Sequence, residues 1–257
     1  MRLQGRVAIV TGGGSGLGRA GALALSREGA KLLVSDVNEA AARETVAQIS
    51  GQGGEGRVCV ADAGRAADAE RMVREAIDAF GVLHILYNNA GIALPFEDGF
   101  SARVEPEVWD RVIRVNLSSV FYCSKYAIPE IAKAGGGAII NTASSMAHLP
   151  LGGLDGYAAS KGGVAMLTKS MAVGCGPMNI RVNAISPGYV DTPMNAVIWG
   201  NEEMKKGFEK GHMTGLQTPE EIAEVVVFLA SDEARSLTGA VINCDRGWTA
   251  FKQPVLL

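Results

Sequence analysis

Short apolar runs alternate along the chain with longer stretches in which apolar residues recur at helical spacing. The runs are nearly continuous, which is typical of strands covered on both faces of a parallel sheet. This pattern predicts strands at 6–11, 31–36, 57–62, 83–88, 137–144, 180–186 and 239–245. It predicts helices at 17–28, 39–50, 66–79, 106–134, 155–173 and 219–230.

Regular alternation of strands and helices predicts the fold class: α/β, with a doubly wound parallel sheet of about seven strands and helices on both faces. The last helix has a well-defined start, because Thr218 can cap it, Pro219 lies in its first turn and Glu221 follows the cap by three residues. No linker, internal repeat or Pro/Ser-rich tract divides the chain, so residues 1–257 are expected to form a single domain.

Composition and charge exclude several classes of protein. With 47% hydrophobic and 20% charged residues, the chain is expected to bury a large core. The formal net charge of −3 argues against nucleic acid or an anionic membrane as the main partner. No apolar run reaches the roughly 18 residues that suggest a membrane span, and the N-terminal apolar stretch is too short for a signal peptide.

The cysteines and histidines show no ligand-like spacing. Four cysteines lie at 59, 123, 175 and 244 without a CxxC pair, and three histidines lie at 84, 148 and 212. Neither a disulfide framework nor a metal site is expected, and the pattern fits a reducing cytoplasm.

The first predicted strand runs into the glycine-rich segment TGGGSGLG, residues 11–18. Such a turn lets backbone N–H groups approach a pyrophosphate, and the following helix presents its positive N-terminal end to the same group. Its place between strand and helix favours a dinucleotide site over a tight turn without a ligand. The candidate cofactor-binding residues here are Gly12, Ser15, Gly16, Leu17 and Gly18.

The second predicted strand ends at Asp36, eighteen residues after Gly18. A carboxylate there can accept both hydroxyls of an adenosine ribose and would repel a 2′-phosphate. No Lys or Arg lies in 12–18 or 37–42, so the sequence favours NAD over NADP. The alternative is that Asp36 caps the helix at 39–50, a role that Asn38 could fill equally well.

Three further motifs follow in order: NNAG at 88–91, YAASK at 157–161 and SPGYVDTP at 186–193. Together with TGGGSGLG, they make the chain resemble the short-chain dehydrogenase/reductase family, in particular its members of about 250 residues. The resemblance covers essentially the whole chain and implies a Rossmann fold that binds a nicotinamide dinucleotide.

The resemblance also implies a catalytic tetrad. Its serine is Ser144 rather than Ser145, because the family's serine usually lies three residues after the strand asparagine and thirteen before the tyrosine. The implied tetrad is Asn116, Ser144, Tyr157 and Lys161.

Further cofactor contacts are implied in the same way. Asp62 would meet the adenine edge, although Ala63 follows it where the family often has a hydroxyl residue. Asn88 and Ala90 would lie along the cofactor, and Thr192 would lie at its nicotinamide end. The remaining implied contacts are Gly91, Tyr157, Lys161, Pro187, Gly188 and Val190.

These residues imply hydride transfer between NAD and a secondary alcohol or ketone. Tyr157 is the expected general acid/base, and Lys161, one helical turn away, would favour its phenolate. Ser144 would hydrogen-bond the substrate oxygen, and Asn116 would hold a water that connects Lys161 to solvent. Two alternatives remain: an NADPH-type 3-oxoacyl thioester reductase, which Asp36 argues against, and a non-catalytic dinucleotide-sensing regulator, which the intact tetrad argues against.

Two segments are expected to shape substrate specificity. One is the predicted loop at 92–108, and the other is 189–216, whose apolar residues suggest a short helical lid. The alternative for the second segment is ordinary packing on the sheet or against a neighbouring subunit. A lone histidine such as His148 is more often structural than functional. The candidate substrate contacts are Ser144, His148, Met194 and Trp199.

The resemblance implies a homotetramer with two-fold axes. The predicted helix at 106–134 carries an apolar stripe that one sheet face need not cover, and the tail at 248–257, including Trp248, is a second apolar surface. Arg246 precedes this tail where the family commonly has glycine. The alternative is that the stripe packs internally and the tail frays. The stripe consists of Val112, Val115, Val120, Tyr122 and Ile128.

Overall fold

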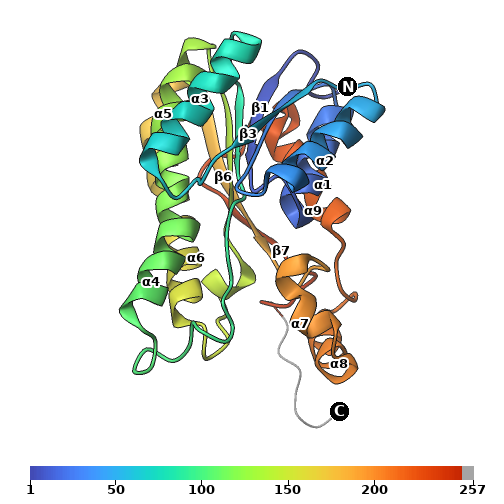
Figure 1. Cartoon of the computed structure of the whole chain (residues 1–257), viewed down its shortest axis with the longest axis vertical. Coiled ribbons are helices and arrows are strands. Elements are labelled where there is room, and N and C mark those ends of the chain that lie inside the picture. Colours follow the sequence, from blue (N-terminus) through green and yellow to red (C-terminus); the bar gives the residue numbers. More distant parts are fainter. Residues whose placement is uncertain (251–257) are drawn as a thin grey trace.

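The structure is a computed structural model, and it describes residues 1–250. A seven-stranded parallel sheet runs through it in the order β3-β2-β1-β4-β5-β6-β7 (Figure 1). The strands are β1 (Val7–Thr11), β2 (Lys31–Asp36), β3 (Gly56–Val60), β4 (Ile85–Asn88), β5 (Gly137–Thr142), β6 (Ile180–Pro187) and β7 (Val241–Cys244). The helices are α1 (Gly16–Arg27), α2 (Glu39–Gly51), α3 (Ala66–Phe80), α4 (Pro106–Ile113), α5 (Ser119–Lys133), α6 (Asp155–Cys175), α7 (Ala196–Trp199), α8 (Glu202–Gly211) and α9 (Pro219–Ala230).

The predicted α/β fold is confirmed, with small differences at the element ends. Strand β7 is shorter than the predicted 239–245, because Gly239 and Arg246 on either side of it have φ angles of 74° and 46°. Extended backbone cannot pass through this left-handed region. Helix α9 begins as predicted, because Thr218 Oγ1 accepts from the Glu221 N–H and Glu221 Oε2 accepts from the Thr218 N–H.

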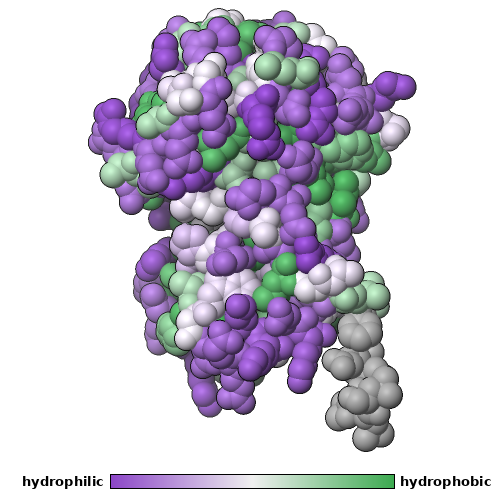
Figure 2. All heavy atoms as spheres, turned by 90° about the vertical axis from the view of Figure 1, so that its right-hand side faces the viewer, coloured by the Kyte–Doolittle hydropathy of each residue, from purple (hydrophilic) through white to green (hydrophobic). Residues whose placement is uncertain are grey.

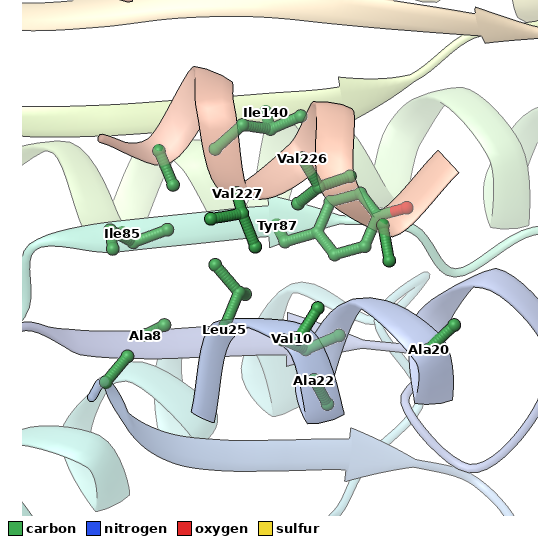
Figure 3. Packing of buried hydrophobic residues seen from close by; sticks show 14 of the residues in the cluster. Ala8, Val10, Ala20, Ala22, Leu25, Ile85, Tyr87, Ile140, Val226 and Val227 are labelled. Carbon is green, nitrogen blue, oxygen red and sulfur yellow. The ribbon is translucent and has the colours of Figure 1, made fainter. Parts of the chain in front are cut away.

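Two layers of helices cover the sheet. Helices α1, α2 and α9 lie on one face, and α3, α5 and α6 lie on the other (Figure 1). On the first face, Leu25 of α1 and Val226 and Val227 of α9 pack with Tyr87 and Ile140 of the sheet (Figure 3). Fully burying one such aliphatic side chain is worth about 1.5–3 kcal/mol. This core fixes the glycine-rich start of α1 relative to the strand ends.

The predicted helix at 106–134 forms as α4, a π-helical turn at Arg114–Ser118, and α5. A π turn holds an extra residue and often occurs beside a functional site; here it contains Asn116, which is buried. All five residues of the predicted apolar stripe are buried or half-buried within the chain, because α5 packs on α3 and on the sheet. The stripe therefore does not by itself indicate a subunit interface.

The segment 189–216 contains α7 and α8, which extend beyond the sheet (Figure 1). An aromatic cluster forms the base of this extension, with 4.0 Å between the ring centres of Tyr189 and Phe208 and 4.9 Å between those of His212 and Trp248. His212 is buried; its Nε2 accepts from the Tyr189 N–H at 3.2 Å, and its Nδ1 then donates to the Phe208 carbonyl at 2.7 Å. Trp248, which the sequence assigned to an apolar tail, packs in this cluster and is half-buried. A contact of the tail with another subunit stays a prediction. The predicted tail beyond residue 250 lies outside the described residues.

The face that carries α1, α2, α7 and α8 is mostly hydrophilic, with hydrophobic side chains in separate patches (Figure 2). None of the helices in residues 1–250 has the length and hydropathy needed to cross a bilayer. The four cysteines are buried and unpaired.

Candidate active site

The carboxyl ends of the parallel strands border a cavity of about 520 Å³. The strand order reverses between β1 and β4, and doubly wound sheets bind ligands at such a reversal. Most of the residues that the sequence assigns to a dinucleotide line this cavity. They are Gly12, Ser15, Gly16, Leu17, Asp36, Asp62, Ala90, Gly91, Tyr157, Lys161, Pro187, Gly188, Val190 and Thr192.

Several glycines of the turn between β1 and α1 lie where a side chain would collide with neighbouring atoms. Gly12 has a φ of 63°, and a Cβ on it would lie 2.9 Å from the Cα of Ala90. Gly18 does not line the cavity; a Cβ there would collide with the Gly12 carbonyl, so Gly18 fixes the packing of α1 against the turn. Ser15 precedes α1, but its side chain makes no capping bond, and the first turn contains no acidic residue. The protein thus leaves the positive end of α1 open to an anion.

Asp36 lies at the end of β2 and lines the cavity. One carboxylate oxygen accepts a hydrogen bond from the Gly14 N–H and the other accepts one from the Asn38 N–H, both at 2.9 Å. Helix α2 is capped by Asn38, whose Oδ1 accepts from the Ala41 N–H at 3.1 Å. Asp36 is therefore not the cap of this helix, and its carboxylate joins the glycine-rich turn to the second strand.

Within NNAG, the residue at the cavity is Asn89 rather than the predicted Asn88. The side chain of Asn88 is buried between β4, β5 and α5, where it donates to Asn141 Oδ1 at 2.9 Å and to Ser124 Oγ at 3.2 Å. Successive side chains of an extended segment point to opposite sides, so the next residue faces the glycine turn. Asn89 Nδ2 donates to the carbonyls of Thr11 and Gly12, at 3.1 and 3.2 Å.

Asp62 lines the cavity, but both of its carboxylate oxygens have protein partners. Oδ1 accepts from the Gly64 N–H at 2.9 Å, and Oδ2 pairs with Nη1 of Arg114 at 2.7 Å. This ion pair ties the segment after β3 to the π-helical turn. The predicted contact of Asp62 with an adenine edge stays a prediction.

Tyr157 and Lys161 lie one turn apart on α6, with Lys161 Nζ 5.6 Å from the centre of the Tyr157 ring. The buried ammonium donates to the Thr142 carbonyl at 2.8 Å, and burial lowers the pKa of Lys161 from 10.5 to about 8. Burial also raises the pKa of Tyr157, and a hydrogen bond with Ser144 partly offsets this effect. The sequence predicted a lowered phenol pKa in the presence of oxidised nicotinamide; within the protein itself, desolvation outweighs the Ser144 hydrogen bond.

Ser144 and Asn116 complete the predicted tetrad in different ways. Ser144 lines the cavity, and its Oγ accepts from the Met146 N–H at 3.2 Å. Asn116 lies behind the cavity wall: Oδ1 accepts from the Ile92 N–H at 2.7 Å, and Nδ2 donates to the Ile92 carbonyl at 2.9 Å and to Ser160 Oγ at 3.1 Å. Asn116 thereby fixes the start of the loop after β4, and its predicted water-holding role stays a prediction.

The burial of Lys161 leads to a pH-dependent stability prediction. Because its folded pKa is about 8 and its ordinary value is 10.5, the unfolded chain binds more protons between these values. The cost of burying the ammonium is fully present below the folded pKa and is lost as the pH rises to the ordinary value, a change of about 3 kcal/mol. We expect the unfolding free energy of the wild type, minus that of Lys161→Met, to rise by this amount between pH 7.5 and 10.5 in urea titrations. A flat difference would contradict the assignment.

No sequence motif pointed to Asp98, a buried carboxylate in the loop after β4. Its Oδ1 accepts from the Gly156 N–H at 3.0 Å, and its Oδ2 accepts from the Tyr157 N–H at 2.7 Å. The same loop is held a second time, because the Ser101 N–H donates to Asp155 at 2.8 Å. These three bonds fix the first turn of α6, which carries the tyrosine.

The predicted substrate contacts are only partly at the cavity. Ser144 and Met194 line it, whereas His148 and Trp199 do not. The Nε2 atom of His148 is 3.1 Å from Ser186 Oγ, which fits the structural role that is usual for a lone histidine. The short α7 presents Val197 and Ile198 to the cavity, so Trp199 points elsewhere.

Comparisons with known proteins agree with this arrangement. A family model described as enoyl-(acyl carrier protein) reductase matches residues 12–249. Cyclohexanol dehydrogenase of Acinetobacter sp. (strain SE19) is 40% identical over 250 residues, covering 97% of both chains. Cis-4-hydroxycyclohexanecarboxylate dehydrogenase of Sinomonas cyclohexanicum is 37% identical over 246 residues, covering 95% of this chain and 97% of the relative.

Among solved structures, the 3-ketoacyl-(acyl-carrier-protein) reductase of Brucella melitensis, complexed with NADH, superposes with a TM-score of 0.89 at 34% identity. The match covers 96% of this chain and 99% of that one. These matches extend over nearly the full length of the chain and agree with the predicted motifs. The chain belongs to the short-chain dehydrogenase/reductase family, whose members are oxidoreductases.

Proposed function

We propose that the chain is an NAD(H)-dependent dehydrogenase that interconverts a secondary alcohol and its ketone. The supporting observation is the common cavity that joins the glycine-rich turn and Asp36 at one end to Ser144, Tyr157 and Lys161 at the other. A regulator that only sensed the dinucleotide would not require this tetrad. A cytoplasmic location is part of the proposal, supported by four buried thiols that are unpaired.

The residues present fit a nicotinamide dinucleotide. The uncapped end of α1 suits the pyrophosphate, and the turn at Gly12 has the close backbone approach that this group needs. Asp36 lies where a ribose would bind. The nearby guanidinium of Arg19 is already bonded to Glu44, at 2.9 Å, and to the Gly14 carbonyl. A 2′-phosphate would thus face a carboxylate without a free cation from Arg19, which supports NAD over NADP.

When bound, the oxidised nicotinamide would accept the hydride and add a positive charge beside the phenol. Tyr157 is proposed to take the proton of the substrate hydroxyl during oxidation and to return it during reduction. Ser144 is proposed to donate to the substrate oxygen, while the ammonium of Lys161 stabilises the phenolate. The Thr142 carbonyl and the Asp98 carboxylate hold Lys161 and the start of α6 in position.

A 3-oxoacyl thioester reductase is the second candidate function. The similarity to the 3-ketoacyl-(acyl-carrier-protein) reductase of Brucella melitensis favours it. Asp36 argues against the NADPH-dependent form of this activity, for the reason given above. The two candidates differ in substrate: an acyl thioester would be reduced by one and not by the other.

The proposal is tested with a panel of secondary alcohols, namely cyclic, aryl, steroid, sugar and polyol compounds, with NAD or NADP and the nicotinamide absorbance as readout. Acetoacetyl thioester with NADH or NADPH is the comparison. We expect oxidation of at least one alcohol with NAD and little reduction of the thioester. A preference for the thioester would replace the proposed activity with the second candidate.

We also propose a homotetramer, for which the outer faces of α5 and α6 offer support. Phe121, Met166 and Val173 on these helices are 49%, 64% and 80% exposed. We expect light scattering at micromolar concentration to give four times the monomer mass, and Met166→Glu to lower this mass. A variant that lacks 251–257 is the control, because it removes the tail without changing α5 and α6 and so shows whether the tail contributes to the assembly. A wild-type monomer under these conditions would rule out the tetramer.

A further inference from the structure

The cavity changes character along its length. Its ionisable side chains near neutral pH, among residues 1–250, are Asp36, Asp62 and Lys161. Asp36 is the last residue of β2 and is bonded to the glycine-rich turn, and Asp62 follows the end of β3. The ammonium of Lys161 is bonded to the Thr142 carbonyl under the tyrosine ring. No charged side chain of the described residues therefore lines the part of the cavity beyond Tyr157.

Apolar side chains from three separate segments form this outer part of the cavity, here called the substrate half. The loop after β4 contributes Ile92 and Pro95, the segment after β5 contributes Met146, and the segment with α7 and α8 contributes Val197 and Phe208. Four polar side chains other than Tyr157 line it: Ser144, Ser145, Tyr189 and Asn195. Ser144 is hydrogen-bonded to Tyr157, and the amide nitrogen of Asn195 already donates to the Val190 carbonyl at 2.8 Å. Polar recognition is thus concentrated at the reacting end.

The opening of the substrate half is apolar as well. Leu151, Met194 and Val197 line it and remain 37%, 43% and 47% exposed. Exposed aliphatic side chains gathered at a cavity mouth mark a site for an apolar ligand. An ionised group entering here would lose hydration without meeting a partner charge.

We infer that the substrate half selects uncharged secondary alcohols with an apolar body and rejects those that carry a carboxylate. This inference rests on the proposed dehydrogenase activity and narrows its substrate class. Sugars and polyols are disfavoured for a related reason, because they carry more hydroxyl groups than the few polar side chains of this mostly aliphatic wall can pair with. An apolar ring with one hydroxyl group fits both the wall and the reacting end.

The test compares two ring alcohols that differ by one charged group, cyclohexanol and cis-4-hydroxycyclohexanecarboxylate, each with NAD. We expect kcat/KM to be at least about 100-fold higher for cyclohexanol, because the carboxylate of the other alcohol would be buried without a partner charge. Comparable values, or a preference for the carboxylate, would overturn the inference while leaving the dehydrogenase proposal intact.

A binding measurement keeps the inference testable if neither alcohol is oxidised. Cyclohexanone and 4-oxocyclohexanecarboxylate are compared as ligands of the protein with NADH, by the rise in melting temperature. Stabilisation by the uncharged ketone alone would support the selectivity even without turnover, and the alcohol panel would then decide the proposed activity. Equal stabilisation by both ketones, or none by the uncharged one, would refute the selectivity.

A charge introduced at the opening tests whether charge, rather than size, causes the discrimination. Leu151→Arg places a cation beside the bound ring, and Leu151→Gln is a matched control with a polar but uncharged side chain. We expect Leu151→Arg to raise the carboxylate-to-cyclohexanol ratio of kcat/KM by about tenfold, and Leu151→Gln to change it by less than about threefold. An equal effect of both variants would contradict a charge-based selection.

Discussion

Replacing Tyr157 with Phe is expected to lower turnover at least about 100-fold, because general acid–base catalysis is typically worth 10²–10⁴-fold. The phenol oxygen transfers the proton in the proposed reaction, whereas the ring only packs in the cavity wall. NADH binding, measured by fluorescence titration, should stay within about twofold of wild type, because the glycine-rich turn and Asp36 are untouched.

Tyr126→Phe is the matched control, since it removes a phenol from α5, outside the cavity lining. It should leave turnover unchanged. If Tyr157→Phe retains more than about a tenth of the wild-type rate, the phenol is not the general acid/base. A loss of NADH binding in the same variant would indicate a collapsed site rather than a missing proton donor.

The second large effect is expected for cofactor choice. Asp36→Ala should weaken NAD and improve NADP, so that the ratio of their kcat/KM values falls by at least about tenfold, equivalent to about 1.4 kcal/mol of relieved repulsion. Initial rates with the two cofactors at a saturating alcohol give this ratio. The wild type should have the lower KM for NAD, and a lower KM for NADP would show that the second strand had been misinterpreted.

Asp36→Asn separates charge from architecture. The Asp36 carboxylate also accepts the N–H groups of Gly14 and Asn38, so the alanine variant loosens the glycine-rich turn as well as removing the charge. An amide oxygen can retain one of these bonds. If both variants shift the preference equally, charge decides cofactor choice; if only the alanine variant does, the shape of the turn decides it.

The order of the sheet and its helices follows from the sequence, because strand and helix periodicities are local properties. Continuous apolar runs and glycine-rich turns sufficed to place β1, the turn after it and α1, and the capping box at Thr218 located the start of α9. The family resemblance likewise implied Ser144, Tyr157 and Lys161, and the structure places all three at one cavity. Residues one turn apart on a helix, such as Tyr157 and Lys161, share a face, so this pairing follows from local geometry.

Other features depended on contacts between distant segments, about which one chain's local pattern contains no information. Asp98 holds the backbone of Tyr157 across 59 residues, and the ring of Trp248 packs on Tyr189 and His212 of the same chain. The burial that raises the pKa of Tyr157 likewise exists only in the folded chain, whereas the nearby lysine is visible in the sequence. The sequence by itself determined the fold and the candidate reacting groups, because these follow from local patterns and motifs. The tertiary structure decided their burial, their supports and the uncharged part of the cavity wall, because these depend on contacts between distant segments.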